Sequence, residues 1–168
     1  ATHPIFTPYY IIPIVMLSAN DPVENGFVAS LARPGGNVTG YATVAAEVAA
    51  KRIALLHELV PSARRIGVLV NPAVSPFGFS REAIARACAA FGAEATFVEA
   101  TSRASLATAL DELARRRIDA LAVVTDGLFI DNRESILAAA GGHRWPVAAE
   151  GRDMLDAGAL VELALRHE

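Results

Sequence analysis

Short apolar stretches alternate with amphipathic stretches along most of this chain. The short stretches are rich in β-branched residues and predict buried strands at 66–70, 95–100, 120–124 and 147–149. Between them, apolar positions recur at helical spacing and predict helices at 80–91, 103–115, 132–140 and near 151–157. Strands separated by helices of this length form βαβ units with a parallel sheet. We therefore expect a doubly wound α/β domain from about Arg65 onward.

Glycine and proline mark the expected ends of several helices. The helix 80–91 is expected to end at Gly92, and the helix 132–140 at Gly141-Gly142. A preceding amphipathic segment, EVAAKRIALLHELV, carries an apolar stripe and is expected to end at Pro61.

The first part of the chain holds fewer elements. IIPIVML predicts a buried strand and NVTGY a second, shorter one. Between them, Asp21 and Glu24 form a capping-box pattern that predicts a helix through Phe27, Val28 and Leu31, ending before Pro34. These elements are too few to close a sheet. We therefore expect three parts, namely 1–45 as a piece of another domain, 46–64 as a connecting helix or hinge, and 65–168 as the main domain.

Polar residues follow the predicted strands at the point where each strand stops. They are Asp21, Asn71, Thr101, Asp126 and Glu150. In an open parallel sheet, ligands bind in the crevice outside the carboxyl ends of the strands, so this placement predicts a small-molecule site.

Two loops of this rim suggest how a ligand is held. Asn71, Ser75 and the following backbone amides can donate to an anionic group. The Asp126 carboxylate can accept from an ammonium group, and Gly127 permits close backbone approach. The alternative is that Asn71 and Asp126 are ordinary turn formers.

The other rim residues also have two interpretations. Asp21 is sufficiently explained as a helix cap, and Glu150 can bind a ligand or pair with Arg152. Three phenylalanines near the loops can stack on an aromatic ligand or pack against a helix; these are Phe77, Phe79 and Phe129.

Composition excludes several classes of protein. A net charge of −3 and a pI near 5.8 give no footprint for nucleic acid, and Arg115-Arg116-Arg117 is interpreted as a solvated helix end rather than a phosphate patch. Cys88, the single cysteine, is expected to be a buried structural thiol, so neither a disulfide within the chain nor a structural zinc site is expected. No stretch is long and apolar enough for a membrane span, and ATHPIFTPYY shows no export signal.

Catalysis finds no support in the sequence. None of the four histidines follows a predicted strand, and His57 is expected to face solvent from a helix. Glycine-rich dinucleotide and phosphate loops, a nucleophile elbow and an HExxH motif are all missing. We expect neither an enzyme nor a bound cofactor or metal.

Several strings carry a resemblance to a known family. NDPVENGFVASLARPGGNVTG, AAKRIALLHELVPSARRIGVLVNP, the TDGLF stretch and the HRWP stretch resemble the ABC-transporter substrate-binding proteins that include tryptophan- and tyrosine-binding lipoproteins. These proteins have the type I periplasmic binding protein fold. The similarity covers about residues 11–161, with departures at Val74-Ser75-Pro76 and Ala148-Ala149 that indicate a reshaped pocket.

The resemblance implies a receptor whose two lobes close on a small ligand, an amino acid or related carboxylate, and present it to a membrane permease. Residues 1–45 would then be a remnant of the other lobe, with Asn20 and Asp21 reaching the ligand from that side. An extracytoplasmic lipoprotein location would follow, and self-association would cover apolar surface of the remnant. The alternative is the effector-binding sensor domain of a regulator with the same architecture.

Overall fold

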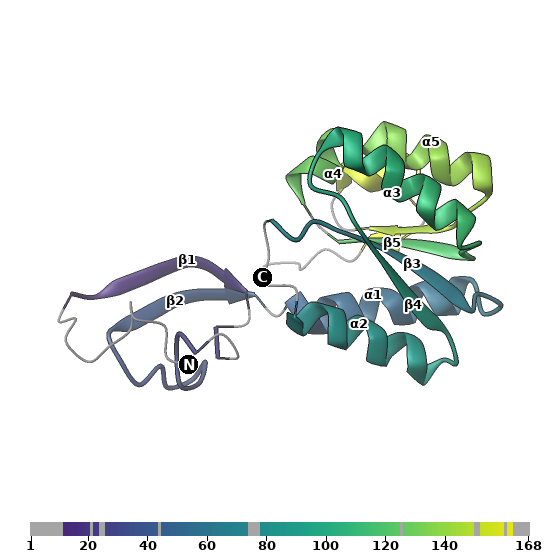
Figure 1. The fold of residues 1–168 in the computed structure, drawn as a ribbon. Coiled ribbons are helices and arrows are strands. Elements are labelled where there is room, and N and C mark those ends of the chain that lie inside the picture. The colour runs from purple at the N-terminus through teal and green to yellow at the C-terminus, as the bar shows by residue number, and fades with distance from the viewer. Residues whose placement is uncertain are drawn as a thin grey trace. The chain divides into compact units, whose positions relative to one another are not determined.

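The computed structural model describes residues 12–20, 22–23, 26–43, 45–73, 78–124, 126–149, 152–159 and 161–162. The chain divides into two compact units, Ala1–Ala46 and Glu47–Glu168 (Figure 1).

The larger unit contains a five-stranded sheet in which every pair of neighbours is parallel. Its strands are β3 (Arg65–Val70), β4 (Glu94–Glu99), β5 (Ala120–Val123), β6 (Val147–Ala149) and β7 (Val161–Glu162), in the spatial order β4-β3-β5-β6-β7. The helices are α1 (Ala45–Leu59), α2 (Gly78–Ala90), α3 (Arg103–Arg115), α4 (Gly127–Asp131), α5 (Arg133–His143) and α6 (Arg152–Asp156). The prediction of a doubly wound α/β domain is confirmed.

Helices cover both faces of this sheet, with α1 and α2 on one face and α3, α4 and α5 on the other (Figure 1). Side chains of the buried strand β3 pack against the helices on both faces of the sheet, because successive side chains of a strand point to opposite faces. Val68 packs in the cluster that includes Leu56 of α1 and Cys88 of α2. Leu69 packs in the cluster that includes Leu113 of α3. The sheet is therefore buried on both faces, which explains the continuous apolar runs in its sequence.

Helix α3 begins and ends where the sequence predicts. Ser102 is its N-cap: the side chain accepts from the Ser105 N–H, and the Ser105 hydroxyl accepts from the Ser102 N–H, which completes a capping box. Such a cap satisfies backbone donors that the helix leaves unpaired.

Helix α5 differs from the prediction at its end. It continues through Gly141 and Gly142 to His143, and the chain leaves it at Arg144, whose φ is 59°. The Trp145 N–H then donates to the Ala140 carbonyl at 2.8 Å. Ile136 and Ala140 are buried against the sheet, and this packing outweighs the low helix propensity of the two glycines.

The smaller unit contains a two-stranded parallel sheet of β1 (Ile14–Asn20) and β2 (Val38–Thr43). The helix predicted through Phe27, Val28 and Leu31 is wrong, because residues 26–37 form turns and bends. Gly26 and Gly35 have φ values of 73° and 80°, and the Ala29 N–H donates to the Pro34 carbonyl at 2.9 Å. The backbone between Gly26 and Gly35 therefore forms a hydrogen-bonded loop instead of a helix.

Candidate functional site

The topology of the larger unit has a switch point between β3 and β5. The chain passes from β3 outward to β4 on one side, and then returns to β5 on the other side. The chain segments that follow two such neighbouring strands turn away from each other at the carboxyl ends of the strands. Doubly wound sheets bind their ligands at this switch point. Asn71 directly follows β3, and Asp126 follows β5 by three residues.

Asn71 and Asp126 are joined across this switch point. The Asn71 Nδ2 donates to Asp126 Oδ1 at 3.0 Å, and both residues are buried, with relative exposures of 5% and 8%. Asn71 Oδ1 in turn accepts from the Ala73 N–H at 3.1 Å. The pair therefore fixes the orientation of both side chains at the rim.

Asp126 is also the N-cap of the short helix α4. Its Oδ1 accepts from the Leu128 N–H at 2.8 Å, so this oxygen is held by two donors. Oδ2 receives no hydrogen bond from the part of the chain that the structure describes. Asp126 is thus a helix cap whose second carboxylate oxygen accepts no hydrogen bond from the described residues, so its role as a turn former does not conflict with the predicted ligand contact.

Gly127 is the first residue of α4. A Cβ built on Gly127 would meet no atom within 4 Å, and its φ is not in the left-handed region. The fold does not itself require glycine at this position, and the space next to Gly127 is open.

Arg52 is a rim residue that the sequence reasoning missed. It projects from α1, is 5% exposed, and its Nη1 lies 3.5 Å from the carbonyl oxygen of Val123 at the end of β5. The signal was present, because Arg52 lies at helical spacing with Ala49 and Leu56 on the buried stripe of α1. A buried guanidinium near this rim places positive charge close to the carboxyl end of the sheet.

The structure describes only some of the other predicted rim residues. Ser75, Asp21 and Glu150 lie outside the described residues. Asn20 ends β1 in the smaller unit, where its backbone pairs with Thr43. Thr101 is exposed, and its N–H donates to the Ser105 hydroxyl at 3.0 Å beside the cap of α3.

The structure selects packing over stacking for Phe129 and corrects the expectation for His57. Phe129 is 1% exposed and belongs to the core, so it cannot stack on a ligand. Phe77 and the side chain of Phe79 lie outside the described part of the chain. His57 does not face solvent freely: it is half-buried, and its ring stacks on Phe91 with centroids 4.4 Å apart.

Cys88 matches the prediction of a structural thiol. It is fully buried among α1, α2 and the sheet, and burial raises the pKa of this thiol to about 11. A thiol with so high a pKa is almost entirely protonated near neutral pH and is a poor nucleophile.

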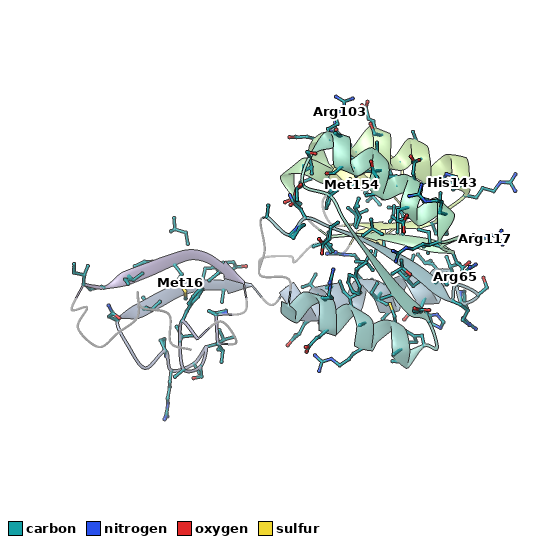
Figure 2. All side chains as sticks on the ribbon, in the orientation of Figure 1. Met16, Arg65, Arg103, Arg117, His143 and Met154 are labelled. Carbon is teal, nitrogen blue, oxygen red and sulfur yellow. The ribbon has the colours of Figure 1, made fainter. Side chains whose placement is uncertain are left out.

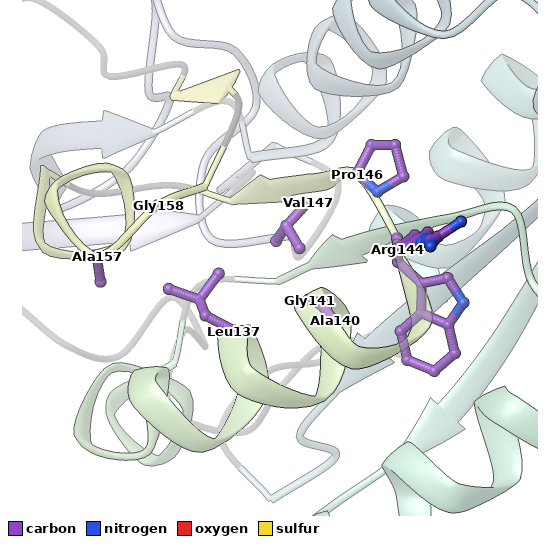
Figure 3. A pocket seen from close by; sticks show the side chains of 9 residues that line it. Leu137, Ala140, Gly141, Arg144, Pro146, Val147, Ala157 and Gly158 are labelled. Atoms are coloured by element: carbon purple, nitrogen blue, oxygen red, sulfur yellow. The ribbon is translucent and has the colours of Figure 1, made fainter.

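A hollow of about 340 Å³ lies elsewhere in the unit (Figure 3). Trp145 and Pro146, which line it, precede β6, and Gly158 precedes β7. The hollow therefore lies at the amino ends of the strands, away from Asn71 and Asp126. We assign the candidate ligand site to the switch point, because the buried polar pair is there.

Two further properties of the described residues bear on the class of protein. They contain no group of three or more His, Cys, Asp or Glu side chains placed to hold a metal ion. None of their helices combines the length and apolarity that a membrane crossing needs.

The fold defines a doubly wound α/β lobe with a buried polar pair, Asn71 and Asp126, at its switch point. The family model described as ABC transporter substrate binding protein matches residues 5–168. The chain therefore belongs to the ABC transporter substrate-binding protein family.

Individual relatives agree with this assignment. The chain is 28% identical over 160 residues to the tyrosine-binding protein of Clostridioides difficile strain R20291, covering 94% of this chain and 45% of that protein. The ligand-free, open structure of a substrate-binding protein with adhesive properties from Clostridium difficile has a TM-score of 0.65 and 28% identity, covering 89% of this chain and 50% of that one. This chain thus spans about half the length of these relatives.

A third comparison concerns the fold alone. An ABC domain from Streptococcus pneumonia in complex with L-Trp has a TM-score of 0.76 and 20% identity, covering 92% of this chain and 51% of that one.

Proposed function

We propose that this chain acts in an ABC importer as part of the solute-binding component, and that its ligand is an amino acid or a related carboxylate. One observation carries the proposal: the Asn71–Asp126 pair lies at the switch point, with Asp126 Oδ1 held by two donors and Oδ2 facing none in the described chain. A carboxylate fixed in this way is preorganised to accept from an ammonium group.

The two ends of an amino acid find complementary charges at this rim. Asp126 supplies a negative charge for the ammonium group. The loop after Asn71, with Ser75, and the positive charge of Arg52 favour the carboxylate end. Tyrosine and L-Trp, the ligands in the names of two relatives, belong to the same chemical class and support this choice.

The proposed mechanism uses two lobes. Residues 65–168 form the ligand-binding lobe, residues 46–64 the hinge, and residues 1–45 part of the other lobe, from which Asn20 and Asp21 reach the ligand. Glu150 contributes from the rim of the ligand-binding lobe. A ligand that contacts both lobes selects the closed form, since only that form makes both sets of contacts.

Family membership also suggests the setting of this protein. Substrate-binding proteins of this family deliver small ligands to ABC permeases and work outside the cytoplasm. We assign this chain a permease partner, an extracytoplasmic lipoprotein location and no catalytic activity.

Self-association is the remaining part of the proposal. Val15 and Leu17 lie two residues apart on β1, so they share one face of the strand, and they are 64% and 88% exposed. A two-stranded sheet with an exposed apolar face is rarely stable alone. A second copy that packs on this face would bury both side chains. Light scattering should then show a dimer whose population rises with concentration, and Leu17→Glu should return it to monomer. A concentration-independent monomer would contradict this part.

A ligand screen by two-dimensional NMR tests the site proposal and detects weak binding. The Leu128 and Ala73 amides are direct reporters, because each donates to a side chain of the pair. Amino acids should shift these two amides, whereas the matching decarboxylated amines and deaminated acids should shift them less. Shifts confined to other parts of the chain would refute the assignment.

A further inference from the structure

Two arginines in the larger unit adopt a backbone conformation that glycine adopts more easily. Arg117 and Arg144 have φ values of 54° and 59°, and they are the positive-φ residues other than glycine in the described chain. Each follows a long helix, α3 or α5, and precedes a strand, β5 or β6. Gly92, with a φ of 69°, occupies the corresponding place after α2. The Cβ of an L residue is strained in this conformation, so the two arginine side chains need an explanation.

The two arginines lie on neighbouring loops. β5 and β6 are adjacent, and the Leu121 N–H donates to the Pro146 carbonyl at 2.8 Å at the start of both strands. Arg117 and Arg144 are exposed, and neither guanidinium has a hydrogen bond or ion pair with the described residues.

Further arginines extend this surface, which we call the basic edge. It consists of Arg64, Arg65, Arg115, Arg116, Arg117 and Arg144, six of the 15 lysines and arginines of the chain. Arg65 starts β3, the neighbour of β5, and Arg115 ends α3. Figure 2 shows Arg65 and Arg117 at the same end of the unit, with Arg103 at the opposite end.

Acidic side chains compensate this edge only in part. Glu112 pairs with Arg115 and Arg116 at 2.6 and 2.7 Å, and Asp119 pairs with Arg65 at 3.2 Å. Glu58 in the last turn of α1, Glu94 at the start of β4 and Asp156 at the end of α6 are further acids of this end. An excess of one positive charge remains, in a chain whose net charge is −3.

We propose that the basic edge docks onto an anionic phospholipid surface. Guanidinium groups match the geometry of phosphate oxygens, and several basic side chains on one surface attract anionic lipid additively. Protein interfaces usually have an apolar centre. The large exposed apolar side chains described in this unit are Leu59 on α1 and Leu155 on α6, so neither lies on the loops that carry Arg117 and Arg144. The inference goes beyond the proposed function, because the basic edge lies at the amino ends of the strands and the ligand rim at their carboxyl ends.

Co-sedimentation with vesicles tests this proposal. The parent chain should bind vesicles of phosphatidylcholine with phosphatidylglycerol at low salt, and should not bind vesicles of phosphatidylcholine alone. A double variant, Arg117→Gly with Arg144→Gly, should weaken binding about twenty-five-fold, since each basic side chain near such a surface contributes roughly fivefold. Its thermal midpoint should not fall, because glycine relieves the strain of the left-handed conformation. Arg117→Asn with Arg144→Asn should give the same loss, since asparagine also tolerates this conformation.

A matched control removes the same charge elsewhere. Arg103 and Arg133 begin α3 and α5 at the opposite end of the strands, so Arg103→Gln with Arg133→Gln should leave vesicle binding nearly unchanged. Equal binding to neutral and anionic vesicles, or equal losses in the control and the double variant, would overturn the proposal. The amide shifts of Leu128 and Ala73 on ligand addition should be the same in all variants, which separates this test from that of the ligand site.

Discussion

The amide of Asn71 donates to the carboxylate of Asp126 over 3.0 Å, although 55 residues separate the two in the sequence. The bond joins the ends of β3 and β5, which are the strands on either side of the switch point. Loss of the amide should therefore cost stability as well as order at the rim. Asn71→Leu leaves a buried carboxylate with one donor fewer and should lower the free energy of unfolding by about 1–3 kcal/mol, measured by urea denaturation. An unchanged unfolding midpoint would show that the bond is not formed in solution.

Asp119 predicts a specific pH dependence of stability. Burial raises the pKa of this carboxyl, but hydrogen bonds from the backbone N–H groups of Arg64 and Arg65 and from the Arg65 guanidinium outweigh burial and hold the pKa below its usual value. The resulting stability is present above the unfolded pKa of about 3.9 and is lost as the pH falls through the folded pKa.

Asp119→Asn keeps an acceptor and removes the charge. The variant should be less stable than the parent by about 0.5–1.5 kcal/mol near neutral pH. The difference should shrink as urea titrations are carried below roughly pH 4. A constant difference across this range would mean that the charge of Asp119 does not stabilise the fold.

Two glycines of the larger unit should respond to alanine in opposite directions. A Cβ on Gly67 of β3 would stand 2.5 Å from Ile118 Cδ1, whereas a Cβ on Gly142 of α5 would meet no atom within 4 Å. Gly67→Ala should therefore destabilise by about 1–3 kcal/mol through overpacking. Gly142→Ala should stabilise by about 0.5–1 kcal/mol through helix propensity.

A second substitution isolates the cause at Gly67. Ile118→Val removes the Cδ1 atom, so the double variant Gly67→Ala with Ile118→Val should recover part of the loss in a double-mutant cycle. Additive losses would show that the clash with Ile118 is not the reason.

Gly40 is the corresponding test for the smaller unit. Its φ is 140°, and a Cβ there would overlap backbone atoms of Met16 on β1, including the carbonyl oxygen. The strained conformation alone costs about 1–3 kcal/mol for a non-glycine residue. Gly40→Ala should therefore open the β1–β2 pairing and speed hydrogen exchange of the Ile14 amide, which donates to Asn37 at 2.8 Å. Gly36→Ala is the control, since no atom lies within 4 Å of its Cβ; equal exchange in both variants would contradict this account.

Apolar patterning was sufficient to predict the main architecture. Strands such as β3 are buried on both faces, so they appear in the sequence as continuous apolar runs, and α3 was bounded correctly because its amphipathic stripe is regular. The pattern failed where local hydrogen bonds decide the backbone, as in the loop of residues 26–37. It also failed at Gly141, because tertiary packing of α5 outweighs propensity there.

The site was predictable in position but not in detail. Parallel strands place Asn71 and Asp126 at one rim, which the sequence indicated, but their direct bond depends on β3 and β5 being neighbours. Strand order is a tertiary property that spacing along the chain does not determine. Arg52 was missed because a single polar residue in an apolar helical stripe is easily ignored.

The most direct test of the central claim is calorimetry of ligand binding by Asp126→Asn. Asparagine can keep both bonds of Oδ1 and replaces Oδ2, the oxygen we propose to face the ligand, by an NH₂ group, so the fold should persist while the proposed acceptor for the ammonium group is lost. We predict a loss of roughly 10- to 100-fold in affinity for the amino acid found in the screen, as expected for a hydrogen bond to a charged group. Asp111→Asn, an exposed change on α3, should bind like the parent. Undiminished affinity in Asp126→Asn would contradict the account.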